Sequence, residues 1–251
     1  METLLEGQRA LVTGAGRGIG SAIARQFAKY GASVAVSYRG SRDGAQRIVD
    51  EIMDAGGTAF ALQADLTDET EAARLVAQAK DALGGLDTLV NNASGFGPLR
   101  PLADADATYL LEEWRAVVLP VVTTTRAVLP LFIEQKRGCV VNLSATLLQR
   151  PAPGQGAHGM AKSAVLSYTR TLAREVGPQG IRVNAVSPGM ALTEFSQNLP
   201  EADKEAVRLR TPLRRLATPD DVASAVIFFC SPLADFITGA NLAADGGLAV
   251  L

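Results

Sequence analysis

The sequence predicts a single α/β domain built on a doubly wound parallel sheet of about seven strands, with helices on both faces. Short apolar runs rich in β-branched residues alternate with helical patterns along the chain, and these runs are apolar without a break. A glycine-dense turn joins the first run to the first helical segment. The 251 residues show no shift in composition and no internal repeat that would mark a second domain.

The predicted strands follow the apolar runs in order. They span residues 10–12, 33–37, 59–63, 88–91, 139–143, 182–187 and 241–243. Helix-length patterns fill the gaps between them. Because parallel strands need long crossover connections, and because these crossovers are right-handed, we expect helices to cover the sheet on both sides.

The turn after the first strand, residues 13–20, contains Gly14, Gly16, Gly18 and Gly20. A side chain in this turn would keep the backbone away from a bound phosphate, and the helix that begins near Ile19 would present free N–H groups to it. The pattern predicts the pyrophosphate of a dinucleotide. A turn that only closes a strand–helix unit is the alternative, and the spacing differs from the usual Gly-x-Gly-x-x-Gly.

Tyr38 and Arg39 follow the second strand, where the adenosine ribose of a bound dinucleotide is expected. An acidic residue at this place would favour NAD, but Tyr38 stands there, and Arg17 lies inside the glycine turn. Guanidinium groups match phosphate with paired donors, so Arg17 and Arg39 predict a 2′-phosphate and therefore NADP(H). The alternative is that both arginines are solvated surface charges.

Two further strand ends carry polar residues. Asp65 follows the third strand and is expected to accept a hydrogen bond from the adenine amino group. Thr67 or Asp68 is expected to cap the next helix, and a plain cap would give the same pattern. Asn91 and Asn92 end the fourth strand, where their amides can link neighbouring strands and shape the floor of the cofactor cleft.

Composition and charge narrow the possible partners. The net charge is -2 and no basic stripe is present, so we expect a small-molecule substrate rather than nucleic acid or an anionic membrane. Cys139 and Cys230 are expected to be buried thiols in a reducing compartment, and a single histidine, His158, is too few for a histidine-based metal site. Without a basic leader or an apolar run of membrane-spanning length, a cytoplasmic location is expected.

Several motifs occur in a fixed order along nearly the whole chain. They are the turn 13–20, Asp65-Leu66, Asn91-Asn92-Ala93, Lys162, the run 181–189 with Thr193, and the ending Thr238-Gly239 followed by Asp245-Gly246-Gly247. Together they resemble the short-chain dehydrogenase/reductase family, which also has this glycine spacing. The resemblance implies a Rossmann-like fold, a nicotinamide cofactor, and a homotetramer or homodimer paired through the helix 222–230 and the last strand.

The resemblance also implies where the rest of the cofactor binds. Asn91 and Ala93 would lie on the adenosine side, and Lys162 would bind the hydroxyls of the nicotinamide ribose. The segment 188–193 would hold the carboxamide end, although a plain turn and a helix cap are the alternatives there. With the residues named above, the predicted cofactor site comprises Gly14, Arg17, Gly18, Ile19, Gly20, Tyr38, Arg39, Asp65, Leu66, Asn91, Ala93, Lys162, Pro188, Gly189 and Thr193.

The catalytic positions that the resemblance implies are mostly altered. The family usually uses an Asn–Ser–Tyr–Lys set, in which the Tyr hydroxyl passes the proton and Lys lowers its pKa. When the chain is aligned on this pattern, Val117 stands at the Asn position, Ala145 at the Ser position and His158 at the Tyr position. Only Lys162 is retained.

His158 and Lys162 are the predicted catalytic residues. They lie four residues apart at the start of a predicted helix and can share one face. An imidazole can relay protons near neutral pH, but a Lys⁺ neighbour disfavours its charged form and the ring reaches roughly 2 Å less far than a Tyr hydroxyl. The alternative is a His that only packs at a helix start. Ser144 and Thr146 flank Ala145, but neighbours on a strand point to opposite faces, so neither is expected to replace the Ser.

Three functions remain open at this point. The first is an NADPH-dependent reductase with altered proton delivery, acting on an activated ketone, an imine or a conjugated alkene such as an enoyl or dienoyl thioester; residues 142–147 with Arg150 resemble the dienoyl-CoA reductases of the family. The second is a non-redox enzyme on the same fold, such as a cyclase or dehydratase. The third is an NADP(H)-binding protein without activity. Residues 190–212 are expected to form a lid over the substrate.

Overall fold

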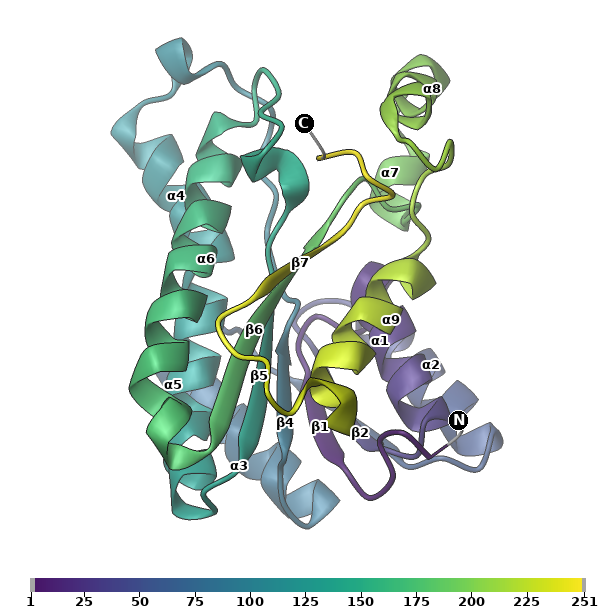
Figure 1. Cartoon of the computed structure of the whole chain (residues 1–251), viewed down its shortest axis with the longest axis vertical. Coiled ribbons are helices and arrows are strands. Elements are labelled where there is room, and N and C mark those ends of the chain that lie inside the picture. Colours follow the sequence, from purple (N-terminus) through teal and green to yellow (C-terminus); the bar gives the residue numbers. More distant parts are fainter. Residues whose placement is uncertain (1–2, 250–251) are drawn as a thin grey trace.

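The computed structural model describes residues 3–249, so the two residues at each end of the predicted domain lie outside it. Within this range the strands form one parallel sheet in the order β3-β2-β1-β4-β5-β6-β7 (Figure 1). The strands are β1 (Arg9–Val12), β2 (Ser33–Tyr38), β3 (Ala59–Gln63), β4 (Thr88–Asn91), β5 (Gly138–Leu143), β6 (Ile181–Pro188) and β7 (Asn241–Ala244). The predicted fold class is therefore confirmed, and every predicted strand is present with its ends displaced by at most one residue.

Helices connect the strands and cover both faces of the sheet (Figure 1). One face is covered by α1 (Gly18–Lys29), α2 (Arg42–Asp54) and α9 (Pro219–Cys230), the other by α3 (Glu69–Leu83), α5 (Leu119–Glu134) and α6 (Gly156–Val176). Helix α4 (Ala107–Val117) packs against α6. The short helices α7 (Glu194–Gln197) and α8 (Glu201–Arg210) lie at the end toward which the strands run. Single 3₁₀ turns span Leu102–Asp104, Thr146–Leu148, Gly177–Gln179 and Pro232–Ala234.

Two apolar cores lie on opposite sides of the sheet. Neighbouring residues of one strand alternate between them: Val12 belongs to the core under α1, α2 and α9, whereas Leu11 belongs to the core under α3, α5 and α6. The unbroken apolar runs in the sequence follow from this burial on both faces. The strand order reverses at β1, which lies between β2 and β4, and in open α/β sheets the ligand crevice forms outside the carboxyl ends of the strands at such a point.

The two cysteines lie side by side between the sheet and α9. Both are free and buried, and the Sγ atoms of Cys139 and Cys230 are 3.9 Å apart. The prediction of buried thiols is confirmed, whereas the reducing compartment stays a prediction.

Helices α4 and α5 follow each other almost without a break. The segment Ala107–Glu134 is long and apolar enough to cross a membrane by length and composition, and its most apolar window of 18 residues has a mean hydropathy of 1.9. The prediction that no apolar run reaches this length is therefore wrong for this segment. Half of its most apolar window is buried inside the protein, where Val128 and Phe132 belong to the core under α3, α5 and α6. Its apolar character is accounted for by packing in that core.

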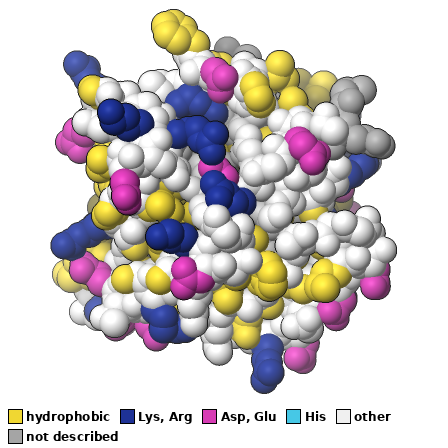
Figure 2. Space-filling model, turned by 90° about the horizontal axis from the view of Figure 1, so that it is seen from below, with side chains coloured by type: hydrophobic (Ala, Val, Ile, Leu, Met, Phe, Trp, Pro, Cys, Tyr) yellow, Lys and Arg dark blue, Asp and Glu magenta, His cyan; other side chains and the backbone are white. Residues whose placement is uncertain are grey.

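Charged side chains of both signs are interspersed on the face seen from below in Figure 2, and apolar side chains occur there in small groups. Asp87, just before β4, is a buried carboxylate that is paired with two arginines. Arg9 Nε donates to Asp87 Oδ2 at 2.8 Å, and Arg137 Nη2 donates to Oδ1 at 2.5 Å. Burial would raise the pKa of Asp87, but hydrogen bonds and charges from Arg9 and Arg137 outweigh it and hold the pKa below its usual value.

Replacing Asp87 with Asn is expected to lower the free energy of unfolding at pH 7 by about 2 kcal/mol, because the three charge-assisted hydrogen bonds from Arg9 and Arg137 are weakened. The pKa of Asp87 is lower in the folded state than in the unfolded state, so its contribution is present above the unfolded value of 3.8 and is lost as the pH falls through the folded value. Urea denaturation of both proteins across this range measures the difference, which should shrink in acid. The exposed Asp54→Asn is the control and should show no such pH-dependent loss.

Candidate active site

The glycine turn between β1 and α1 has the shape of a phosphate cradle. Gly14 and Gly18 have φ values of 63° and 56°, which favour glycine. A Cβ at Gly14 would lie 2.9 Å from Ala93 Cα, and a Cβ at Gly20 would lie 2.5 Å from the Gly14 carbonyl oxygen. Arg17 is the N-cap of α1 and makes no side-chain cap hydrogen bond. The N-terminus of α1 is therefore not capped by its own side chain, as an anion site requires.

A cleft of about 910 Å³ opens beside this turn, at the carboxyl ends of the central strands. Ten of the predicted cofactor residues line it: Gly14, Arg17, Gly18, Ile19, Tyr38, Arg39, Asp65, Leu66, Ala93 and Thr193. Five do not line it: Gly20, Asn91, Lys162, Pro188 and Gly189. The structure thus brings together the segments predicted for the adenosine and pyrophosphate end of a dinucleotide.

The amides at the end of β4 divide into two roles. Asn91 is 2% exposed, and its Nδ2 donates to Asn142 Oδ1 and to Thr125 Oγ1, both at 2.8 Å. Asn91 therefore links β4 to β5, as predicted for the amides, but its side chain does not reach the cleft. Asn92 does line the cleft, and its Nδ2 donates to the carbonyl oxygens of Thr13 and Gly14. Asn92 is the residue that fixes the glycine turn over the sheet.

Asp65 is largely engaged by its own turn. Its Oδ1 accepts hydrogen bonds from the backbone N–H and the hydroxyl of Thr67, and Arg39 Nη1 lies 3.9 Å from Oδ2. The backbone hydrogen bond from Thr67 is the largest cause that holds the pKa of Asp65 below its usual value. Asp68, not Thr67, caps α3, since it accepts from the N–H groups of Thr70 and Glu71. The predicted contact of Asp65 with adenine stays a prediction.

The segment after β6 is held by turns and caps. The N–H of Gly189 donates to the carbonyl of Ala244, and a Cβ at Gly189 would lie 2.9 Å from Asp245 Cβ. Thr193 is the N-cap of α7 and forms a capping box with Ser196. Thr193 therefore caps α7 and also lines the cleft, and its contact with the carboxamide end of the cofactor stays a prediction.

His158 makes a partly buried contact that the sequence motifs do not show. Its Nδ1 is 2.6 Å from Oε1 of Glu113, which comes from α4 and is 4% exposed. Glu113 Oε2 accepts a hydrogen bond from the N–H of Gly97. Phe96, which lines the cleft, packs edge-on against the imidazole with ring centroids 4.7 Å apart. The imidazole is thus held next to the cleft by a carboxylate and an aromatic ring.

Lys162 is the other charged group of this cluster. It is 6% exposed, and its Nζ donates to the carbonyl of Leu143 at 2.8 Å. Burial lowers the pKa of Lys162 to about 8, and the Glu113 carboxylate offsets part of this effect. For His158, burial and the Lys162 charge lower the pKa, and Glu113 opposes them. The sequence-based expectation that Lys162 disfavours the imidazolium agrees with this direction.

The remaining altered positions offer no replacement catalytic group. Val117 is completely buried. Ser144 Oγ donates to the Lys162 carbonyl at 3.3 Å, and Thr146 Oγ1 donates to the Pro188 carbonyl at 3.1 Å. Both hydroxyls are engaged with the backbone, in line with the prediction that neither takes the place of the missing Ser at position 145.

Glu113 was missed by the motif analysis, although a signal for it exists. In α4, the buried residues Tyr109, Glu113 and Val117 recur every four residues. A single acid on the apolar stripe of a helix is expected to have a partner, because an isolated buried carboxylate is costly. Helical periodicity could therefore have singled out Glu113, but not its partner.

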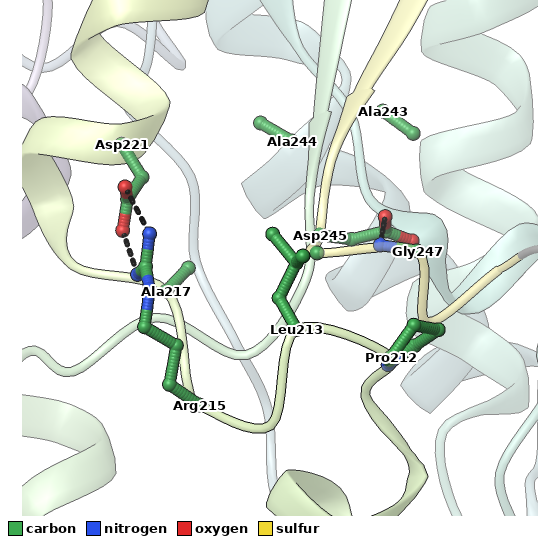
Figure 3. A pocket seen from close by; sticks show the side chains of 10 residues that line it. Pro212, Leu213, Arg215, Ala217, Asp221, Ala243, Ala244, Asp245 and Gly247 are labelled. Atoms are coloured by element: carbon green, nitrogen blue, oxygen red, sulfur yellow. Dashed lines mark hydrogen bonds and ion pairs between the residues drawn. The ribbon is translucent and has the colours of Figure 1, made fainter.

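A second hollow, of about 480 Å³, lies between β7 and the segment before α9 (Figure 3). Arg215 Nη2 donates to Asp221 Oδ1 at 2.8 Å, and Asp245 Oδ1 accepts from the N–H of Gly247 at 2.9 Å. The Arg215, Asp221 and Asp245 side chains that line this hollow all have partners, and no predicted catalytic or cofactor residue lies there. Among residues 3–249, no group of three or more His, Cys, Asp or Glu side chains is placed to hold a metal ion.

Comparisons with known proteins agree with this geometry. A family model described as enoyl-(acyl carrier protein) reductase matches residues 14–249. The chain is 36% identical over 254 residues to the 3-oxoacyl-[acyl-carrier-protein] reductase of Synechocystis sp., covering 98% of both chains. It is also 36% identical over 248 residues to the 7alpha-hydroxysteroid dehydrogenase of Escherichia coli K12, covering 97% of this chain and 94% of the relative.

Solved structures show the same likeness. The structure of a 7alpha-hydroxysteroid dehydrogenase complexed with NADH and 7-oxo glycochenodeoxycholic acid superposes with a TM-score of 0.93 at 34% identity, covering 98% of this chain and 96% of that one. A Serratia marcescens short-chain dehydrogenase/reductase variant superposes with a TM-score of 0.91 at 31% identity, covering 98% and 100%. The chain therefore belongs to the short-chain dehydrogenase/reductase family of oxidoreductases.

Proposed function

We propose that this protein is an NADP(H)-dependent oxidoreductase in which His158 delivers the proton that a tyrosine usually delivers in the family. The substrate class is a small molecule with an activated ketone, an imine or a conjugated alkene. The observation that carries the proposal is the partly buried contact of His158 with Glu113 beside Lys162, next to a ring that lines the cleft. Because the Tyr and Ser positions are altered and only Lys162 is retained, the reaction needs another side chain that can exchange a proton. His158 stands at the Tyr position and can do so.

The shape of the cleft supports a nicotinamide dinucleotide as the cofactor. The glycine turn and the start of α1 fit the pyrophosphate, because side chains at Gly14 and Gly20 would collide with the backbone. The bound nicotinamide would supply or take up the hydride, and residues of this chain would supply or take up the proton. The related hydroxysteroid dehydrogenase is complexed with NADH. The preference for NADP(H) therefore rests on Arg17 and Arg39 of this chain, which both line the cleft.

The proposal is tested by mixing the purified protein with NADPH or NADH and a panel of ketones, imines and enones, and following the absorbance of the reduced cofactor. We expect cofactor oxidation with at least one class and a preference for NADPH. Tight NADPH binding without turnover would favour the inactive binding protein. Product formation without any change in cofactor absorbance would favour the non-redox enzyme.

Replacing Arg39 with Ala is expected to weaken NADPH binding about tenfold, or about 1.4 kcal/mol, and to leave NADH binding unchanged. The effect is modest because the Arg39 side chain is 73% exposed, so that water and salt screen its contact with a phosphate. Titration of each cofactor by calorimetry gives both dissociation constants. Arg42→Ala removes an exposed arginine that does not line the cleft, and it is the matched control. Equal loss of NADPH and NADH affinity in Arg39→Ala would contradict the role of Arg39 at a 2′-phosphate.

The lid, the assembly and the location are part of the same proposal. Residues 190–212 contain α7 and α8, and α8 has no buried residue, so it can move without disrupting either core. We propose that this segment closes over the substrate, that the protein is a homotetramer or homodimer, and that it acts in the cytoplasm. Light scattering after size-exclusion chromatography measures the assembly, and protection of 190–212 from hydrogen exchange on cofactor addition measures closure.

A further inference from the structure

Glu113 is the residue of the site that the family motifs do not account for. Both of its carboxylate oxygens are engaged, one with His158 Nδ1 and the other with the N–H of Gly97. We propose that Glu113 and His158 form an acid–base dyad, in which Glu113 is a positioning residue and Nε2 of His158 exchanges a proton with a substrate hydroxyl. This inference rests on the proposed oxidoreductase function and narrows its substrate class to an alcohol and the corresponding ketone.

The contacts of Glu113 determine which ring nitrogen carries the proton. An ionised carboxylate only accepts hydrogen bonds, so a 2.6 Å contact between Oε1 and Nδ1 requires the proton to be on Nδ1. Oε2 of Glu113 accepts a hydrogen bond from the Gly97 N–H, so both carboxylate oxygens act as acceptors when Nδ1 carries the proton. The neutral imidazole then carries its lone pair on Nε2. It is therefore ready to accept a proton.

The groups around the His158 imidazole act in opposite directions on its protonation. Glu113 approaches from α4 and favours the imidazolium, whereas Lys162, one turn further along α6, disfavours it. The Lys162 ammonium is held by the carbonyl of Leu143 on β5, and Phe96 covers the ring from the loop after β4. Lys162 thus favours the neutral imidazole at rest, and Glu113 can stabilise the imidazolium during the reaction.

The proposed step conserves atoms and electrons. In the oxidising direction, the substrate O–H bond breaks and its proton passes to Nε2, giving an imidazolium whose Nδ1–H remains bound to Glu113. The oxygen electron pair forms the C=O bond as the carbon-bound hydrogen leaves with its two electrons as a hydride, for which NADP⁺ is the acceptor. In the reducing direction, Nε2–H returns its proton to the carbonyl oxygen.

The inference can be tested on His158 directly, because it is the only histidine in the chain. Protein labelled with ¹⁵N-histidine and made without a histidine tag gives one pair of ring-nitrogen NMR signals. We expect Nδ1 to be protonated and Nε2 to be unprotonated in the neutral form. In Glu113→Gln, loss of the carboxylate charge is expected to lower the pKa of His158 by about one unit or more. The exposed Glu112→Gln, one residue earlier on the same helix, is the matched control.

Kinetics on the intact protein with NADP⁺ and secondary alcohols give the second readout. Glu113→Gln is expected to lower kcat roughly 100-fold with little change in KM and to move the pH profile, whereas Glu112→Gln changes neither. If wild-type His158 carries its proton on Nε2, or if Glu113→Gln leaves kcat and the pH profile unchanged, the dyad is wrong while the proposed function stands. If the wild type turns over no substrate in either direction, the proposed function fails and the dyad with it. Should Glu113→Gln not fold, the wild-type tautomer and the pH profile of Glu113→Asp decide.

Discussion

Replacing His158 with Gln is expected to lower turnover by about 10²–10⁴-fold while NADPH binding is retained. The amide keeps a polar group next to Glu113 but cannot exchange a proton near neutral pH. His158 does not line the cofactor cleft, so the glycine turn and the cleft arginines should remain as they are. Steady-state kinetics with the best substrate of the panel, together with calorimetric titration of NADPH, separates the two effects.

The pH dependence of the wild type provides a check on the same residue. Burial and the Lys162 charge lower the pKa of His158 below its usual value of 6.5, so the neutral base predominates above that pH. The rate of alcohol oxidation is therefore expected to be level around neutrality and to fall only in acid. Proton donation in the reducing direction should show the opposite trend, because it needs the imidazolium.

Two outcomes would contradict the role of His158. Unchanged turnover in His158→Gln would mean that the proton comes from water or from the substrate. If the wild type is inactive, the double variant His158→Tyr with Ala145→Ser should create activity, because it restores the residues usual in the family. That result would identify the natural chain as an NADP(H)-binding protein without catalysis.

The sheet could be predicted from the sequence because each strand is short, apolar on both faces and followed by a helix-length connection. Strand β4 illustrates this, since its neighbours Leu89 and Val90 are both fully buried and belong to the cores on opposite sides of the sheet. The cleft followed from the same pattern, because the loops after β1, β2 and β4 must meet where the strand order reverses. These features depend on local patterns and on the general rules of parallel sheets.

The acid–base cluster could not be predicted in the same way. Glu113 and His158 are 45 residues apart in the sequence, and their contact depends on how α4 packs against α6. The direction of the Asn91 side chain was likewise decided by tertiary hydrogen bonds, to Thr125 and Asn142. Motif positions therefore located the cleft, whereas the side-chain partners of residues next to it needed the structure.

Replacing Gly20 with Ala is expected to weaken NADPH binding by about 100-fold, or about 2.7 kcal/mol. The new Cβ would lie 2.5 Å from both the Gly14 carbonyl oxygen and Asn92 Nδ2, closer than real Cβ atoms come to their neighbours. The Gly14 oxygen is backbone and cannot rotate away, so the glycine turn must move and the cradle for the pyrophosphate is lost. The same strain is expected to lower the free energy of unfolding by about 1–3 kcal/mol.

Gly40→Ala is the matched control for Gly20→Ala. Gly40 lines the same cleft, but a Cβ there meets nothing within 4 Å and its φ is not in the left-handed region. Calorimetric titration with NADPH and thermal unfolding of the two variants therefore compare an added Cβ at Gly20, where it collides with its neighbours, with an added Cβ at Gly40, where it meets none. If Gly20→Ala binds NADPH as tightly as Gly40→Ala, the turn is not the cradle. If it loses stability but not affinity, Gly20 serves only the packing of α1 against the sheet.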